Sequence, residues 1–202
     1  MNKGSVLIVS GPSGSGKDTI LKKVFEAMPE IKFSISSITR AMRPGEVEGE
    51  KYNFISREAF EKMLENDMML EHNVFVGNYY GTPRGPVDSV LENGGEIIIE
   101  VDVNGAENIR KKLSETVSIF IMPPSFEVLK NRLSGRGTDS AENVEKRMNE
   151  ALCEIARADE YDYIVVNDEL DKAVDDVITI IKNLRLKTER QKYLINEVLG
   201  KC

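Results

Sequence analysis

The sequence predicts an α/β fold with a parallel sheet, formed around one core that carries two appended segments. Three observations support this prediction. A short apolar run at residues 5–9 precedes a glycine-rich loop and then a segment with helical spacing of apolar residues. Further apolar runs of strand length recur with helical stretches between and after them. Finally, 202 residues suffice for one substantial core but are few for two independent domains.

The elements follow in order along the chain. The first strand leads through the glycine loop into a helix predicted at residues 18–28. The later apolar strand candidates lie at residues 96–102, 117–122 and 161–166. A last stretch, residues 170–199, is predicted to be mostly one helix that covers the sheet.

Two segments interrupt this alternation of strands and helices. Residues 34–85 are rich in Ser, Tyr, Gly and Arg, with short alternating stretches, which predicts a small β-containing insert. Residues 125–158 predict two helices joined by GRGTDS, whose two glycines flank Arg136 and permit a hinge. The predicted core is then residues 1–33, 86–124 and 159–202.

Composition excludes several classes of protein. The net charge of −7 argues against broad electrostatic binding to nucleic acid. No apolar run approaches the ~20 residues that cross a bilayer, and the four-residue run VLIV near the N-terminus is too short for a signal peptide. We therefore expect a cytoplasmic protein. Cys153 and Cys202 show no metal-ligand spacing, so neither is given a function.

The glycine loop matches a phosphate-binding pattern. Gly11, Gly16 and Lys17 fit G-x-x-x-x-G-K, with the strand before and the helix after that this P-loop requires. Glycines let backbone N–H groups turn toward phosphate oxygens, the helix N-terminus adds partial positive charge, and the lysine reaches the β and γ phosphates. Hydroxyl groups for the same purpose come from Ser13, Ser15 and Thr19.

Asp18 stands where the strict pattern has the Ser or Thr that binds Mg²⁺. One interpretation places it outward on the first helical turn, where a carboxylate meets the helix dipole favourably. The other places it toward the metal, bound through a water molecule. The sequence leaves both open and favours the first.

The insert carries a second set of side chains that suit a phosphate. Arg40 and Arg43 are three residues apart, and Tyr52 follows. Two guanidinium groups and a phenol suit a phosphate monoester, because arginine offers planar, bidentate donors. Taken alone, these residues are equally well explained as a solvated surface.

Six stretches together resemble the guanylate kinases. Their counterparts occur in that family in the same order and spacing. The six stretches are GPSGSGK, SSITRAMRPGEVEGEKYNF, EHNVFVGNYYGTP, EIIIEVDVNGA, RLSGRGTDS and YDYIVVND. The resemblance extends from residue 5 to about residue 185. It implies a P-loop kinase core, a GMP-binding insert at residues 34–85 and a helical lid at residues 125–158.

The resemblance also assigns residues to the GMP site. It implies that the GMP phosphate is held by Arg40, Arg43, Tyr52 and Tyr80, and that the guanine is read by Ser36, Glu71, Thr82 and Asp102. This makes chemical sense, because guanine offers adjacent N–H donors to a carboxylate and an O6 acceptor to a hydroxyl. The only histidine, His72, adjoins Glu71 but faces elsewhere on an extended chain, so we interpret it as structural.

Two further acids end the strand at residues 96–102. Glu100 and Asp102 are two apart, so both are expected on one face of the strand, at the end where ligands of α/β sheets bind. The resemblance places Asp102 at the guanine and Glu100 near the water shell of the metal. A solvated Glu100 remains an equal alternative.

For ATP, the resemblance implies a site made of the loop, one asparagine and the lid arginines. The loop residues are Gly11, Pro12, Ser13, Gly14, Ser15, Gly16, Lys17, Asp18 and Thr19; the others are Asn167, Arg132 and Arg136. The expected catalytic residues are Lys17, Arg40, Arg132, Arg136 and Arg147. They stabilise charge in phosphoryl transfer together with Mg²⁺.

The implied activity is ATP-dependent phosphorylation of GMP, with dGMP an expected second substrate, in purine nucleotide metabolism. The expected ligands are ATP, GMP and Mg²⁺, without nucleic acid or membrane, and the oligomeric state is open. One alternative is a guanylate-kinase-like interaction domain, against which Lys17 and the lid arginines argue. Another is a kinase of a different phosphate ester, such as a ribose bisphosphate, which would not need Glu71, Ser36 and Thr82, because a sugar phosphate offers no guanine edge.

Overall fold

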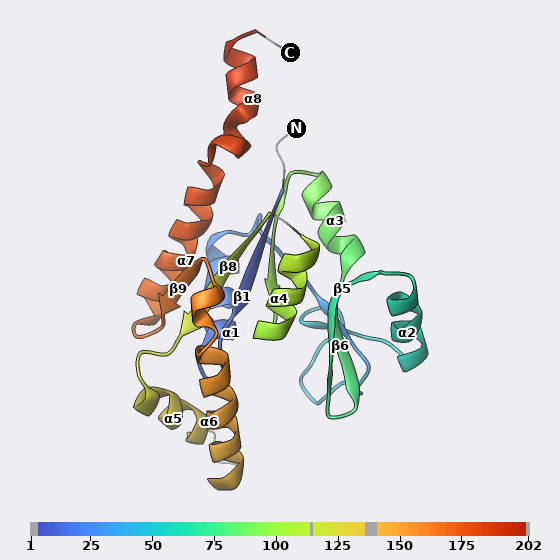
Figure 1. Ribbon diagram of the computed structural model, residues 1–202, viewed down its shortest axis with the longest axis vertical. Coiled ribbons are helices and arrows are strands. Elements are labelled where there is room, and N and C mark those ends of the chain that lie inside the picture. The colour runs from blue at the N-terminus through green and yellow to red at the C-terminus, as the bar shows by residue number, and fades with distance from the viewer. Residues whose placement is uncertain (1–3, 114, 136–140, 201–202) are drawn as a thin grey trace. The chain divides into compact units, whose positions relative to one another are not determined.

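The computed structural model describes residues 4–113, 115–135 and 141–200 (Figure 1). They form two compact units. Unit 1 comprises the described residues of Val9–Glu30 and Ser118–Cys202, and unit 2 comprises Gly4–Ile8 and Ile31–Val117.

The larger sheet has five strands in the order β2-β7-β1-β8-β9. The strands are β1 (Ser5–Ser10), β2 (Lys32–Phe33), β7 (Glu96–Glu100), β8 (Thr116–Met122) and β9 (Tyr163–Val166). β2 pairs with β7, and β8 with β9, in parallel. All of β1 is buried, as its continuous apolar run predicts for a strand covered on both faces. The predicted α/β fold with a parallel sheet is confirmed.

Unit 1 holds the glycine loop and most of the helices. They are α1 (Lys17–Ala27), α5 (Phe126–Ser134), α6 (Ala141–Ile155), the 3-10 helix η1 (Ala158–Glu160), α7 (Leu170–Arg185) and α8 (Thr188–Val198). α1 packs on α7. α5 and α6 lie side by side (Figure 1) and share a small core of Leu129, Leu133, Met148 and Ala151. Arg136, which lies between the two glycines of the predicted hinge, is outside the described residues.

Three boundaries in unit 1 differ from the predicted ones. The helix predicted to reach residue 158 ends at Ile155, and η1 follows it. The strand predicted from residue 161 begins at Tyr163, because the backbone N–H of Asp162 donates to the Ser118 hydroxyl at 3.1 Å in place of a ladder bond. The C-terminal stretch is two helices, which meet at Leu186 and Lys187.

Unit 2 adds a second sheet of four strands in the order β4-β3-β6-β5. Its strands are β3 (Ser36–Ile38), β4 (Tyr52–Phe54), β5 (Met69–Phe75) and β6 (Asn78–Pro83), and its helices are α2 (Arg57–Glu65), α3 (Arg84–Glu92) and α4 (Val103–Lys112). β5 and β6 form an antiparallel hairpin that turns at Val76 and Gly77, both with positive φ. The predicted β-containing stretch therefore also contains a helix, α2, whose N-terminus is capped by the Ser56 hydroxyl.

No helix among the described residues is both long and apolar enough to cross a membrane.

Candidate active site

The glycine loop in unit 1 connects β1 to α1 and is shaped by close contacts. Gly16 has φ 92°, and a Cβ there would lie 2.2 Å from Nδ2 of Asn167. Gly11 has φ 150°, and a Cβ there would lie 2.3 Å from the carbonyl oxygen of Ile121. No other residue type fits either position, because side chains avoid both the backbone conformation and the overlap.

The loop carries polar groups of a kind that suits an anion. The Lys17 ammonium donates to the Gly11 carbonyl at 2.6 Å and lies 3.4 Å from that of Pro12. The Ser15 hydroxyl is fully buried and has no hydrogen-bond partner among the described residues. A buried hydroxyl normally has a partner, so its position in this loop suits a phosphate oxygen as acceptor.

Three residues far away in the sequence converge on the loop. Arg132 of α5 donates to the Asn167 carbonyl at 3.0 Å and to the Ser15 carbonyl at 3.5 Å. Arg147 of α6 donates to the Ser13 hydroxyl at 2.8 Å. The buried Asn167 side chain donates to the Ser15 carbonyl at 2.7 Å. The structure thus brings these predicted residues together around one loop.

Other predicted loop residues differ in exposure. Asp18 and Thr19 are exposed on the first turn of α1. Pro12 is buried, and Gly14 lies against α5, where an added Cβ would be 3.1 Å from Leu133. The position of Asp18 on the first turn is the one in which a carboxylate complements the helix dipole.

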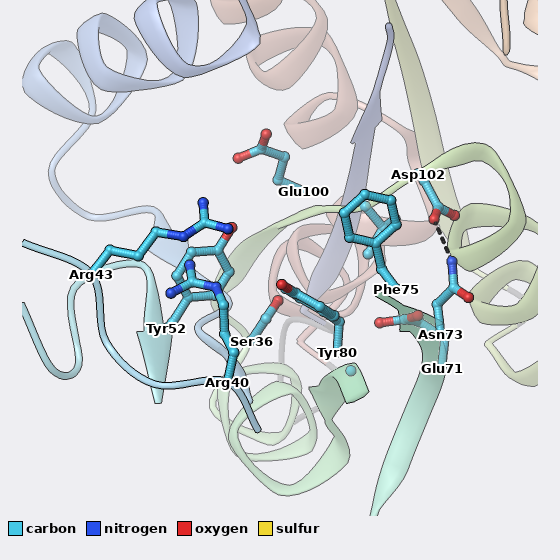
Figure 2. Close-up of a pocket in the computed structure, with 12 residues that line it drawn as sticks. Ser36, Arg40, Arg43, Tyr52, Glu71, Asn73, Phe75, Tyr80, Glu100 and Asp102 are labelled. Atoms are coloured by element: carbon cyan, nitrogen blue, oxygen red, sulfur yellow. Dashed lines mark hydrogen bonds between the residues drawn. The ribbon is translucent and has the colours of Figure 1, made fainter. Parts of the chain in front are cut away.

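Unit 2 contains a pocket of about 350 Å³ (Figure 2). Most of the predicted GMP-site residues line it, together with the predicted metal-side acid: Ser36, Arg40, Arg43, Tyr52, Glu71, Tyr80, Asp102 and Glu100. Figure 2 shows the two arginines and Tyr52 gathered at one end, and Glu71 and Asp102 at the other. The pocket therefore has a cationic end and an acidic end.

At the cationic end, a carboxylate holds Arg40 in place. Glu46 accepts hydrogen bonds from both terminal nitrogens of Arg40, at 2.7 and 2.5 Å. It also accepts one from the backbone N–H of Arg43 at 2.7 Å. The hydrogen bond from Arg40, followed by that from Arg43, lowers the pKa of Glu46 to about 2. The Arg40 guanidinium also lies over the Tyr52 ring, 5.5 Å from its centroid. Its Nε is buried without a partner among the described residues and can still donate to an anion.

At the acidic end, Glu71 is buried and held by a hydroxyl. Thr82, itself fully buried, donates to Glu71 Oε1 at 2.7 Å. Thr82 was expected at the guanine, but it does not line the pocket and instead supports the carboxylate that does. Burial, with a smaller contribution from the negative charge of Asp102, raises the pKa of Glu71 to about 7.

The prediction that Glu100 and Asp102 lie on one strand is wrong. β7 ends at Glu100, and Asp102 is the N-cap of α4, where its Oδ1 accepts the Gly105 N–H at 2.8 Å. Both acids still line the pocket, because the chain turns into the helix directly after the strand. Glu100 also pairs with Lys51 at 3.4 Å.

Sequence reasoning missed two pocket residues on β5. Asn73 and Phe75 line the pocket with Glu71, and the three alternate along one face of the strand. The period of two was the signal that could have found them. His72, between two of these residues, is exposed and does not line the pocket.

The chain has one loop suited to a polyphosphate and a separate pocket whose cationic end suits a phosphate ester. These are the features of a nucleotide-binding kinase. The guanylate kinase family model matches residues 3–184. The chain belongs to the guanylate kinase family.

Individual relatives agree over nearly their full length. A guanylate kinase of Oceanobacillus iheyensis is 48% identical over 188 residues, which cover 93% of this chain and 91% of the relative. One of Escherichia coli is 42% identical over 203 residues, covering 100% and 98%. Among solved structures, a guanylate kinase from Anaplasma phagocytophilum is similar with a TM-score of 0.80 at 31% identity, and covers 100% of this chain and 98% of that one.

Proposed function

We propose that the protein transfers the terminal phosphoryl group of ATP to GMP, forming ADP and GDP. The observation that carries this is the bipolar pocket of unit 2. Arg40 and Arg43 suit a phosphate monoester at one end, and Glu71 with Asp102 suits a ring rich in N–H donors at the other. Guanine presents adjacent N–H donors of this kind, whereas adenine does not.

Within this proposal, the side chains position and stabilise charge. A phosphate monoester with a second pKa of ~6 is already mostly a dianion near neutral pH, so the attacking oxygen needs no general base. Lys17 and the arginines 132, 136 and 147 would bind the triphosphate and its developing charge, and Arg40 would hold the acceptor phosphate. The contacts of Arg132 and Arg147 with the loop support this assignment. Tyr52 and Tyr80, whose ring centroids are 6.5 Å apart, would add phenol donors to the acceptor phosphate.

The residues present also fit Mg²⁺ brought in by the nucleotide. Among the described residues, no three His, Cys, Asp or Glu side chains form a cluster that could hold a metal. Mg²⁺ at kinase sites typically keeps several waters and binds phosphates with only one or two carboxylates. Asp18 or Glu100 would contact it through water. When bound, the ion neutralises charge on the phosphate oxygens.

The proposal extends to organisation and location. Residues 34–85 would close over GMP and residues 125–158 over ATP, so that water is excluded before transfer. A P-loop enzyme of purine nucleotide metabolism would work in the cytoplasm, where ATP and GMP are used. The interaction-domain alternative gives no reason for Arg132 and Arg147 to converge on the loop.

A coupled assay of ADP release with GMP, AMP, UMP and ribose phosphates tests this function. We expect turnover with GMP and at least a hundredfold lower kcat/KM with AMP, roughly what a site loses when its buried hydrogen-bonding groups stay unpaired. Comparable rates with AMP, or faster ones with a ribose phosphate, would overturn the proposal.

Replacing Glu46 tests the cationic end of the pocket. Glu46→Gln removes the negative charge that holds the Arg40 guanidinium in place. A charge-assisted hydrogen bond is typically worth ~1.5–3 kcal/mol, so we expect the KM for GMP to rise about tenfold. The KM for ATP should stay within twofold. Glu50→Gln makes the same charge change at an exposed site nearby and serves as the control. Equal effects of both variants would mean that Glu46 acts only through net charge.

A further inference from the structure

Asn73 places a carboxamide at the acidic end of the pocket. It is the second of three β5 residues that line the pocket, between Glu71 and Phe75. Its Nδ2 donates to Asp102 Oδ2 at 3.1 Å (Figure 2). The other end of the amide accepts the N–H of Val74 at 2.7 Å. Because a backbone N–H can only be met by the amide oxygen, the amide nitrogen must face Asp102.

Asp102 is therefore held by donors from two different elements. Oδ1 accepts the Gly105 N–H at the start of α4, and Oδ2 accepts the Asn73 amide from β5. Two such bonds fix the rotation of the carboxylate plane, which a single N-cap bond leaves free to turn. Each carboxylate oxygen has a second lone pair, so both remain able to accept another hydrogen.

The donors of guanine require two acceptors of this kind. Glu71, as a bidentate acceptor, can take the N1 hydrogen and one hydrogen of the 2-amino group. The second amino hydrogen then needs another acceptor, and Asp102 is the other carboxylate at that end of the pocket.

We propose that Asn73 is a positioning residue that sets the Asp102 carboxylate for the 2-amino group of the purine, so that it contributes to selection of guanine. This rests on the proposed function. Asn73 is exposed, so its bond to Asp102 competes with water and contributes little to folding. A base that fills the pocket displaces this water, and the same bond then holds the acceptor in place at no further entropic cost.

Asn73→Ala in the full-length protein is the first test. We expect the KM for GMP to rise about tenfold, with the KM for ATP and kcat within twofold and an unchanged unfolding temperature. Asn73→Asp keeps the size but turns a negative group toward Asp102, so its KM for GMP should rise further. Val74→Ala changes the exposed neighbour that does not line the pocket, and should behave as the parent protein.

A nucleotide without the 2-amino group separates positioning from general damage to the hairpin. Inosine monophosphate lacks that group, so its inhibition constant against GMP should be nearly equal in the parent and in Asn73→Ala. Losses of the same size for both nucleotides, or an unchanged KM for GMP in Asn73→Ala, would overturn the inference. If the parent protein does not phosphorylate GMP at all, the proposed function itself fails.

A double-mutant cycle gives a second, independent answer. Asp102→Asn keeps a good N-cap for α4 but removes the charge that Asn73 orients. In that background, Asn73→Ala should change the KM for GMP less than twofold, because two residues that act as one unit are not additive. Full additivity would show that Asn73 does not act through Asp102.

Discussion

Lys17→Ala is expected to lower kcat about a thousandfold or more, because it removes a fixed positive charge from the transferring phosphoryl group. The lysine starts α1, and its ammonium already lies within the loop, 2.6 Å from the Gly11 carbonyl. A cation held there needs little reorganisation to meet a phosphate, so its loss should act mainly on the transition state. Single-turnover measurement of GDP formation at saturating ATP and GMP would give this number directly.

Two controls decide whether the effect is chemical. Lys22→Ala removes the same charge from an exposed site on the same helix and should keep kcat within twofold. Lys17→Arg keeps the charge and should fall between the parent and Lys17→Ala. Undiminished turnover in Lys17→Ala would mean that the loop does not take part in the reaction.

The loop was predictable because its signal is local. A buried strand, glycines at fixed spacing and a helix start identify it without knowledge of the rest of the chain. The role of Asn167 against Gly16 was not predictable, since that contact joins residues far apart in sequence. The helix positions of Arg132 and Arg147 could be read from periodicity, but not their contact with the loop.

The acidic end of the pocket shows a different limit. The prediction that Asp102 belongs to the strand failed because the strand pattern was extended by two residues, although an aspartate before a helix is a standard N-cap signal. Asn73 could have been found from the alternation on β5. The Glu46 contacts lie within an irregular loop, where sequence spacing carries no information about which side chains meet.

Glu71→Gln is expected to lower kcat/KM for GMP several hundredfold while the KM for ATP changes little. The amide has one acceptor atom in place of two, and its NH₂ group would face a donor of the base, so buried polar groups stay unpaired. Thr82 can still donate to the amide oxygen, which should preserve the fold. Glu92→Gln, at the exposed last residue of α3, is the matched control. An equal loss for ATP would indicate a folding defect.

The dependence of this loss on pH follows from the buried carboxyl. The pKa of Glu71 is raised to about 7 from its ordinary 4.5, so folding favours the neutral form and this group stabilises the protein most at low pH, a contribution lost as pH rises through 7. GMP binding has the opposite sign, because only the carboxylate accepts both guanine donors. At pH 5.5 only ~3% of the carboxyl is ionised, so the affinity for GMP should be ~30-fold lower than at pH 8.5.

Glu71→Gln is the control for this pH dependence, because its amide does not titrate. Ionisation of the GMP phosphate affects binding to the parent and to the variant alike. The ratio of parent to variant affinity therefore isolates Glu71 and should fall steeply below pH 7, and a ratio that is flat from pH 5.5 to 8.5 would show that this carboxylate does not read the base.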